Sequence, residues 1–161
     1  MLALQIQIRS FDPRDQRESR QVILNGLAEH FGFIDESRNP DLDNIEKSYL
    51  AVGNGFYVAE CDGQIIGTVG LLFEPGYARI VRMSVAKSHR QEGVATALLD
   101  RCIEVARQRG LSEIIAFTEP HWSDAVGFYT ASGFEQFGRD DEDIHLRFSL
   151  RQAGEKASAW K

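Results

Sequence analysis

The sequence predicts an α/β fold with a mixed central sheet of about seven strands flanked by four helices. Three patterns support this prediction. Apolar and polar residues alternate near both ends of the 161-residue chain, which is typical of half-buried strands. Three consecutive strand-like segments precede the longest amphipathic segment, whereas helical and strand-like segments alternate after it. Such an order favours a sheet that contains both antiparallel and parallel pairs.

The N-terminal third is expected to hold one strand and two helices. The motif "FDPRD" predicts a helix start, with Asp12 as N-cap and Pro13 at the first helical position. We expect this helix to end near Gly32 and the second helix to end at Gly53. The alternating apolar residues of the strand are Leu4, Ile6 and Ile8. The apolar residues at helical spacing in the second helix are Leu42, Ile45 and Tyr49.

The remaining elements follow from turn residues and periodicity. Asp62-Gly63 lies between two apolar runs, and a two-residue hairpin turn prefers this pair because both central positions need positive φ. The last helix is expected to be capped by Ser123 or Asp124 and to stop at Gly133. Helices are expected over 94–107 and 123–132, and strands over 55–61, 64–73, 77–85, 113–119, 134–138 and 143–150.

Composition narrows the function classes. The net charge of −6 argues against non-specific nucleic-acid binding. No apolar run reaches the roughly 18 residues that a membrane span needs, and the N-terminus does not resemble a signal peptide, so we expect a cytoplasmic protein. Cys61 and Cys102 have no metal-site or disulfide spacing; Cys102 is expected in the core and Cys61 near the surface. We expect one domain over 1–161, with a frayed tail after about 151.

The segment that leads into the long helix has the features of an anion site. Residues 94–107 place their apolar side chains on one half of a helical wheel, as a helix packed on a sheet does. Gly93 opens this helix, and a helix N-terminus presents free backbone N–H groups to an anion. Lys87, His89 and Arg90 add positive charge, while Glu92 opposes it. A single glycine is a weak motif, so an ordinary helix start is the alternative.

Two separated motifs resemble those of one protein family. The run from Arg90 to Ala95, "RQEGVA", is similar to the acetyl-CoA-binding motif of the GNAT-family N-acetyltransferases, which reads Arg or Gln, two residues, Gly, one residue, then Gly or Ala. Phe128-Tyr129, followed by Gly133-Phe134, resembles the family's second signature. Together with the order of the elements, the resemblance covers roughly residues 9–150.

The resemblance implies an acetyl-CoA-dependent N-acetyltransferase of the acyl-CoA N-acyltransferase fold. In that family the backbone of the last strand before the helix binds the pantetheine arm, and the loop binds the pyrophosphate. The backbone N–H of Val85 would polarise the acetyl carbonyl, and Tyr129 would donate a proton to the leaving thiolate. The residues carried over as cofactor-binding are Met83, Ser84, Val85, Arg90, Gln91, Glu92, Gly93, Val94, Ala95, Ser123 and Tyr129. No metal is implied.

The sequence departs from the family at the general base. Many relatives have a glutamate on the strand before the loop, and Arg79 stands at the aligned position. Glu119, at the end of the next strand, and Glu74 are the alternative bases, and a water chain is a third. Arg79 invites the hypothesis that it pairs with a substrate carboxylate, against the plainer interpretation of a solvated strand arginine.

The acceptor is expected to be a primary amine of a small molecule or peptide. The segment Phe31–Tyr49 usually walls the acceptor site in this family, and here it is acidic and aromatic, which suits a cationic amine. That opposes the Arg79 hypothesis, so the substrate stays open. No nucleic acid or membrane is expected as a partner, and a homodimer is common in such folds. A non-catalytic acyl-CoA-binding sensor or regulatory module is the alternative; a Rossmann-type nucleotide site is disfavoured because the chain has no Gly-x-Gly-x-x-Gly motif.

Overall fold

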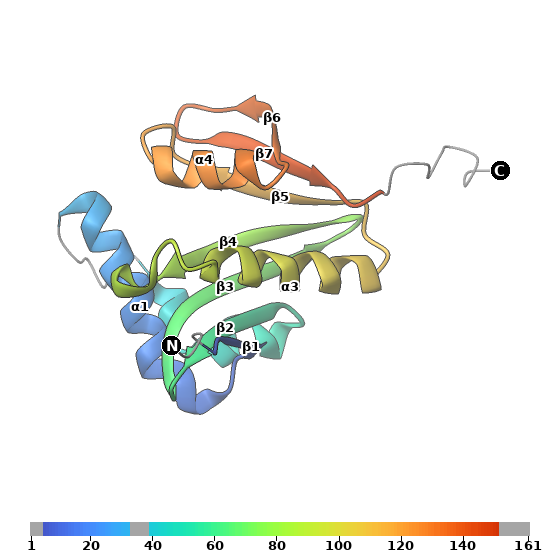
Figure 1. The fold of residues 1–161 in the computed structure, drawn as a ribbon. Helices are drawn as coiled ribbons and strands as arrows, with labels where there is room; N and C mark the ends of the chain where they lie inside the picture. Colours follow the sequence, from blue (N-terminus) through green and yellow to red (C-terminus); the bar gives the residue numbers. More distant parts are fainter. Residues whose placement is uncertain (1–4, 33–38, 152–161) are drawn as a thin grey trace. The chain divides into compact units, whose positions relative to one another are not determined.

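The computed structural model describes residues 5–32 and 39–151. The order of elements is the expected one (Figure 1). The strands are β1 Gln7–Ser10, β2 Gly55–Cys61, β3 Gln64–Glu74, β4 Tyr77–Val85, β5 Glu113–Thr118, β6 Glu135–Arg139 and β7 Ile144–Ser149. The helices are α1 Gln16–Phe31, α2 Ile45–Ser48, α3 Val94–Gln108 and α4 Ser123–Ala131. Leu4 and the tail at 152–161 lie outside the described residues.

The chain forms two compact units. The first comprises Met1–Phe73 and Ile80–Cys102, and the second comprises Glu74–Arg79 and Ile103–Lys161. Strands β1 and β2 belong to the first unit and β5, β7 and β6 to the second, whereas β4 has residues in both units. Each unit is described by itself below.

In the first unit, β1, β2 and β3 form antiparallel pairs. The predicted hairpin is confirmed: Asp62 and Gly63 have φ values of 52° and 77°, and Cys61 pairs with Gln64. The helix start is confirmed as well. Asp12 accepts a hydrogen bond from the backbone N–H of Arg14, in a 3₁₀ turn that leads into α1.

The second helix is not the continuous helix that the periodicity predicts. It is divided into a 3₁₀ turn at Pro40–Asp43, the four-residue α2, and a 3₁₀ turn at Leu50–Val52 that ends at Gly53. Asn44 breaks it with an extended backbone and caps α2 through its side chain. The amide of Gln16 supplies the missing contacts, because it donates to the carbonyl of Leu42 and accepts from the N–H of Ile45. The predicted apolar residues Leu42, Ile45 and Tyr49 are nonetheless buried.

Strand β3 is buried on both faces, which explains its continuous apolar sequence. A Cβ on Gly67 would lie 2.9 Å from a methyl group of Val94 and 3.1 Å from one of Leu98, both on α3. A Cβ on Gly70 would lie 3.1 Å from the ring of Tyr49. The two glycines therefore allow α3 on one face of β3, and the segment around α2 on the other, to approach the strand closely.

In the second unit, β7 pairs antiparallel with β5 and with β6. Helix α4 lies alongside these strands (Figure 1). The ring of Phe134 lies between those of Tyr129 and Phe148, with centroid separations of 5.0 Å from Tyr129 and 5.5 Å from Phe148. Gly133 has a φ of 102°, as expected for the stop after α4. The expected cap is wrong: Trp122 occupies the N-cap position without a side-chain hydrogen bond, and Ser123 and Asp124 already lie within the helix.

Both cysteines are buried and free. Cys102 is in the core as expected, and burial raises the pKa of its thiol to about 12. The expectation that Cys61 lies near the surface is wrong, because only 5% of it is exposed. It ends β2 directly before the tight hairpin turn, and its side chain points to the covered face of the strand. The turn brings the backbone to the surface but not this side chain.

The turn between β6 and β7 is held by the carboxylate of Asp140. One of its oxygens accepts from the backbone N–H groups of Glu142 and Asp143 at 2.8 and 2.7 Å, and the other lies 3.0 Å from Nε2 of His145. The two backbone hydrogen bonds and His145 lower the pKa of Asp140 to about 2. The ionised carboxylate therefore stabilises the folded state at every pH at which Asp140 is charged.

Replacing Asp140 with Asn is expected to lower the free energy of unfolding in a pH-dependent way. The folded pKa lies below the ordinary value of about 4, so the stabilisation is complete above about pH 4 and is lost as the pH falls toward 2. The difference in unfolding free energy between wild type and Asp140→Asn, measured by urea titration from pH 7 to pH 3, should be constant at high pH and then shrink. Asp141→Asn is the matched control; an equal and pH-independent loss in both variants would contradict the assignment.

Candidate active site

The loop before α3 has an unusual backbone. Gln91 and Gly93 both have positive φ, at 63° and 84°. A non-glycine residue in this region is strained by roughly 1 kcal/mol, and such strain often marks a functional site. Alternation of left-handed residues with ordinary ones turns successive N–H groups toward one concavity, an arrangement that binds anions. The N–H groups of the first turn of α3 have no acceptor inside the helix and add to this concavity.

The space beside Gly93 is open. Apart from its chain neighbours, no heavy atom of residues 5–32 and 39–151 lies within 4 Å of the Cβ position at this residue, so these residues leave room for an anion beside the backbone. The carbonyl of Gly93 accepts the first helical hydrogen bond, from Ala97, at 3.0 Å. Gly93 thus takes part in the first hydrogen bond of α3, while the side of its backbone that would carry a Cβ is not covered by the described residues. The loop residues Gln91, Glu92, Gly93, Val94 and Ala95 all lie in the first unit, and their role in cofactor binding stays a prediction.

The charged residues of this loop are largely paired with one another or with α1. Arg90 forms two hydrogen bonds with the carboxylate of Glu29, at 2.6 and 2.9 Å, and these lower the pKa of Glu29 below its ordinary value. His89 Nδ1 lies 3.0 Å from the carboxylate of Glu92. The loop therefore offers an anion mainly its backbone N–H groups and Lys87, and the side chain of Arg90 braces the loop against α1.

The side chain of Arg90 also contacts the end of β4. Arg90 Nε donates to the carbonyl of Val85 at 3.3 Å, and the N–H of Ala86 donates to Ile66 on β3 at 2.8 Å. The hydroxyl of Ser84 donates to the carbonyl of Val22 on α1 at 3.3 Å, so its side chain contacts the helix. Met83, Ser84 and Val85 are all half-buried. They follow one another directly into the loop, as the sequence predicts for the strand that leads to the anion site.

Strand β4 contains a left-handed residue, a backbone conformation typical of a β-bulge, that was not predicted. Arg82 has a φ of 53° in the middle of the strand, and its carbonyl accepts from the hydroxyl of Thr68 at 2.9 Å. Its guanidinium makes two hydrogen bonds with Asp41, at 3.0 and 2.7 Å, and the phenol of Tyr49 donates to the same carboxylate at 2.6 Å. We call Arg82, Asp41 and Tyr49 the bulge clamp. Its only sequence signal is an arginine within a strongly apolar strand.

The bulge clamp is a stabilised charge pair. Burial alone would raise the pKa of Asp41, but the hydrogen bonds from Arg82 and Tyr49 lower it below its ordinary value. Burial and the hydrogen bond to Asp41 raise the pKa of the Tyr49 phenol. Asp41 is therefore a hydrogen-bonded anion rather than a proton acceptor. It ties the expected acceptor wall, of which residues 33–38 lie outside the described part, to the bulge of β4.

The other predicted residues lie in the second unit. Tyr129 on α4 is 6% exposed and contacts the rings of Phe128 and Phe134. Ser123 begins α4. Glu119 directly follows β5 and is half-buried, and its carbonyl accepts from the N–H of Trp122 at 3.1 Å. Each residue is thus placed at the end of a strand or on the helix that the sequence predicts for it.

Comparison with known proteins decides the family. The model of the acetyltransferase (GNAT) family matches residues 21–134, which include both signature motifs. This chain belongs to the GNAT acetyltransferase family. N-acetyltransferase 8 of Rattus norvegicus is 36% identical over 119 residues, covering 70% of this chain and 54% of its own length. N-acetyltransferase 8B of Homo sapiens is 32% identical over 66% of this chain and 50% of its own length. This GNAT chain thus spans about half the length of the curated relatives that it matches.

Solved structures confirm the predicted fold class. A GNAT-family acetyltransferase from Staphylococcus aureus Mu50 superposes with a TM-score of 0.83 at 27% identity, over 91% of this chain and all of the other. The PaiA N-acetyltransferase of Thermoplasma acidophilum, solved in complex with coenzyme A, gives a TM-score of 0.81 at 17% identity, over 90% of this chain and 99% of the other. The mixed seven-stranded sheet with four helices is therefore the GNAT fold.

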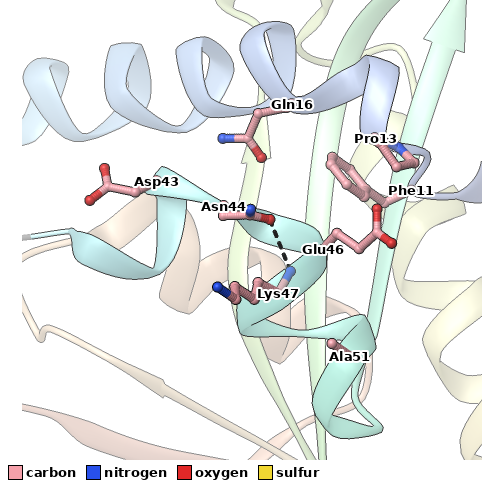
Figure 2. A pocket seen from close by; sticks show the side chains of 8 residues that line it. All are labelled: Phe11, Pro13, Gln16, Asp43, Asn44, Glu46, Lys47 and Ala51. Atoms are coloured by element: carbon pink, nitrogen blue, oxygen red, sulfur yellow. Dashed lines mark hydrogen bonds between the residues drawn. The ribbon is translucent and has the colours of Figure 1, made fainter.

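A surface pocket of the GNAT chain lies elsewhere in the first unit. It has a volume of about 420 Å³ and lies between the start of α1 and the α2 segment (Figure 2). Its lining residues are Phe11, Pro13, Gln16, Asp43, Asn44, Glu46, Lys47 and Ala51. Asp43, Asn44, Glu46 and Lys47 belong to the segment 31–49 that is expected to wall the acceptor site, whereas none of the eight lining residues is a predicted cofactor-binding or catalytic residue. Gln16 and Asn44 already bind the backbone there, at the break in the second helix.

Other site types find no support in the described residues. Within 5–32 and 39–151, no group of three His, Cys, Asp or Glu side chains is placed to hold a metal ion. Over the same ranges, no helix is both long enough and apolar enough to cross a membrane.

The importance of Gly93 can be tested directly. Gly93→Ala is expected to weaken CoA binding about fivefold, because alanine at this φ costs about 1 kcal/mol and the loop can relax away from its anion-binding shape. Isothermal titration calorimetry with CoA measures this change. Gly110→Ala is the matched control, since Gly110 has a φ of 71° and equally open space at its Cβ position but follows the other end of α3. Similar affinities in both variants would exclude the loop as the CoA site.

Proposed function

We propose that this chain is an acetyl-CoA-dependent N-acetyltransferase that moves an acetyl group to a primary amine of a small molecule or peptide by direct attack. The observation that carries the proposal is the loop with positive φ at Gln91 and Gly93, which leads into α3 at the position of the family's acetyl-CoA motif. The family match and the relatives named N-acetyltransferase support the same activity.

Acetyl-CoA fits the residues of the first unit. Its pyrophosphate would accept hydrogen bonds from the N–H groups between Gln91 and Ala95, where the space beside Gly93 is open. The backbone of Met83, Ser84 and Val85 would bind the pantetheine arm. Acetyl-CoA supplies a thioester, which is activated toward nucleophiles. Arg90 is assigned an indirect role here, because its guanidinium is paired with Glu29 and holds the loop.

Three groups of the chain are proposed to act on the reacting atoms. The N–H of Val85 would donate to the carbonyl oxygen on which negative charge develops. The hydroxyl of Tyr129 would give its proton to the departing sulfur. The amine is mostly protonated at neutral pH and must lose a proton before it attacks. Glu119 is the proposed acceptor of that proton and Glu74 is the alternative; the pH–rate profiles of Glu119→Gln and Glu74→Gln distinguish them.

A thiol-release assay with a panel of amines, combined with calorimetric CoA titration, tests the function. Amine-dependent release of CoA is expected. Tight CoA binding without turnover on any amine would instead support a non-catalytic acyl-CoA-binding sensor or regulatory module. The observation that favours this second function is Arg79, which stands where many relatives have a glutamate base.

A further inference from the structure

Arg79, in the second unit, has an unused hydrogen-bonding edge. Its guanidinium carbon lies over the Phe117 ring, 4.4 Å from the ring centre, in a cation–π contact. Its Nε is buried and has no hydrogen-bond partner among residues 5–32 and 39–151. Within these ranges Arg79 forms no ion pair, whereas Arg9 and Arg82 each bind carboxylates at 2.7–2.8 Å. Arg79 is thus oriented by an aromatic ring, not by an acidic partner.

A guanidinium held in this way is prepared for a ligand. The buried Nε is closed to solvent, so a ligand would bind the terminal N–H groups of this half-buried side chain. The contact with Phe117 restricts rotation of the side chain and leaves its N–H groups in the guanidinium plane, where a carboxylate can bind two of them at once. The structure therefore corrects the plainer interpretation of Arg79 as a solvated strand arginine.

The surface next to Arg79 is aromatic. Phe117 is 38% exposed, and its ring centre lies 4.3 Å from that of His145, its partner across β5 and β7. Phe137 extends this aromatic row: its side chain is 42% exposed, and its ring centre lies 5.9 Å from that of His145. The guanidinium carbon of Arg147 lies 5.3 Å from the centre of the Phe137 ring. The row alternates with the residues of β7 whose side chains face the core, Ile144 and Leu146. An exposed apolar row on this sheet face is suited to an apolar group of a ligand.

Charge along the aromatic row is not uniform. His145 is paired with Asp140, and Arg147 lies across the strand pair from Glu135. Glu113 lies on β5, opposite Ser149. The Arg79 end of the row is therefore the end at which a cation has no carboxylate partner in the described residues. Charge complementarity at that end requires an anion, and the planar geometry of the guanidinium favours a carboxylate.

We infer that Arg79 selects amine acceptors that also carry a carboxylate and that an apolar group of such an acceptor packs on Phe117. The inference rests on the proposed function, because it identifies the acceptor of that reaction. It makes Arg79 a specificity-determining residue, not a base.

Phenylalanine and phenylalaninamide are suitable probes, because they share the amine and the ring and differ in the carboxylate. Their affinities are measured by protein-observed NMR titration of the CoA-bound wild-type protein, Arg79→Gln, Arg79→Lys and the matched control Arg147→Gln. We expect wild type and Arg147→Gln to bind phenylalanine at least tenfold more tightly than the amide. The preference should vanish in Arg79→Gln. It should fall to about threefold in Arg79→Lys, which keeps the positive charge but cannot form the two parallel hydrogen bonds of a guanidinium with a carboxylate.

The outcomes separate the two proposals. No preference for phenylalanine in wild type, no binding of either probe, or a preference that persists in Arg79→Gln overturns the inference. Acetyl transfer from acetyl-CoA is measured on the same probes. Turnover without a carboxylate preference would leave the enzymatic function intact and overturn only the role of Arg79. An Arg79-dependent preference without turnover on any amine would overturn the proposed reaction while retaining carboxylate recognition.

Discussion

Replacing Tyr129 with Phe is expected to lower kcat about 100-fold, the lower end of what a positioned proton donor contributes. The ring of Tyr129 contacts Phe128 at 5.1 Å and Phe134 at 5.0 Å, and a phenylalanine ring at this position would keep both contacts. Only the hydroxyl is lost, so the fold and the affinity for CoA should be retained. Steady-state kinetics with the best amine from the panel, together with CoA calorimetry, measure the two effects separately.

Tyr77→Phe is the control for this variant, because it removes a phenol from the start of β4. It should change kcat by less than about twofold, as surface substitutions away from special features usually do. A kcat of Tyr129→Phe within the same range would show that the hydroxyl of Tyr129 does not protonate the thiolate. A large rise in the dissociation constant of CoA, with unchanged kcat, would instead assign Tyr129 to cofactor binding.

Replacing Asp41 with Asn is expected to lower the free energy of unfolding by about 2 kcal/mol, the scale of hydrogen bonds to a charged group. The substitution leaves the guanidinium of Arg82, whose side chain is 21% exposed, without its counter-charge. Arg82 also holds a left-handed backbone in mid-strand, so the bulge of β4 loses the contact that fixes it. Urea unfolding at neutral pH measures the loss.

The neighbouring residues provide graded controls for the bulge clamp. Asp43→Asn alters an exposed carboxylate in the same 3₁₀ turn and should change stability by less than about 0.5 kcal/mol. Tyr49→Phe removes a single hydrogen bond of 2.6 Å from Asp41 and should cost about 1 kcal/mol. If Asp41→Asn were as stable as Asp43→Asn, the clamp would make no net contribution to folding.

Turns, helix caps and helix ends could be predicted because each depends on residues that are adjacent in the sequence. The hairpin at Asp62-Gly63, the cap at Asp12 and the stop at Gly32 each depend on the conformations open to one or two residues. The left-handed Gly93 at the start of α3 could be predicted for the same reason, whereas anion binding by this loop stays a prediction. The apolar residues at helical spacing, Leu42, Ile45 and Tyr49, are buried as predicted even though the second helix is divided.

The features that could not be predicted depend on residues far apart in the chain. Arg90 pairs with Glu29 across 61 positions, and Arg82 pairs with Asp41 across 41. The break in the second helix depends on Gln16, which lies 26 and 29 positions from the two backbone groups that it binds. No short-range pattern specifies such partners. The contact of Arg79 with Phe117, 38 positions away, likewise exists only in the folded chain.

Gly67 has a consequence for how variants of this protein are interpreted. It is not one of the proposed site residues, yet it determines how closely Val94 and Leu98, in the first turns of α3, approach β3. A mutational scan for lost acetyl transfer would score Gly67→Ala as damaging alongside genuine contact residues. A distinguishing sign is compensation: trimming Val94 to Ala in the same chain should restore activity to Gly67→Ala, whereas no second-site change of this kind would restore a residue that touches the cofactor.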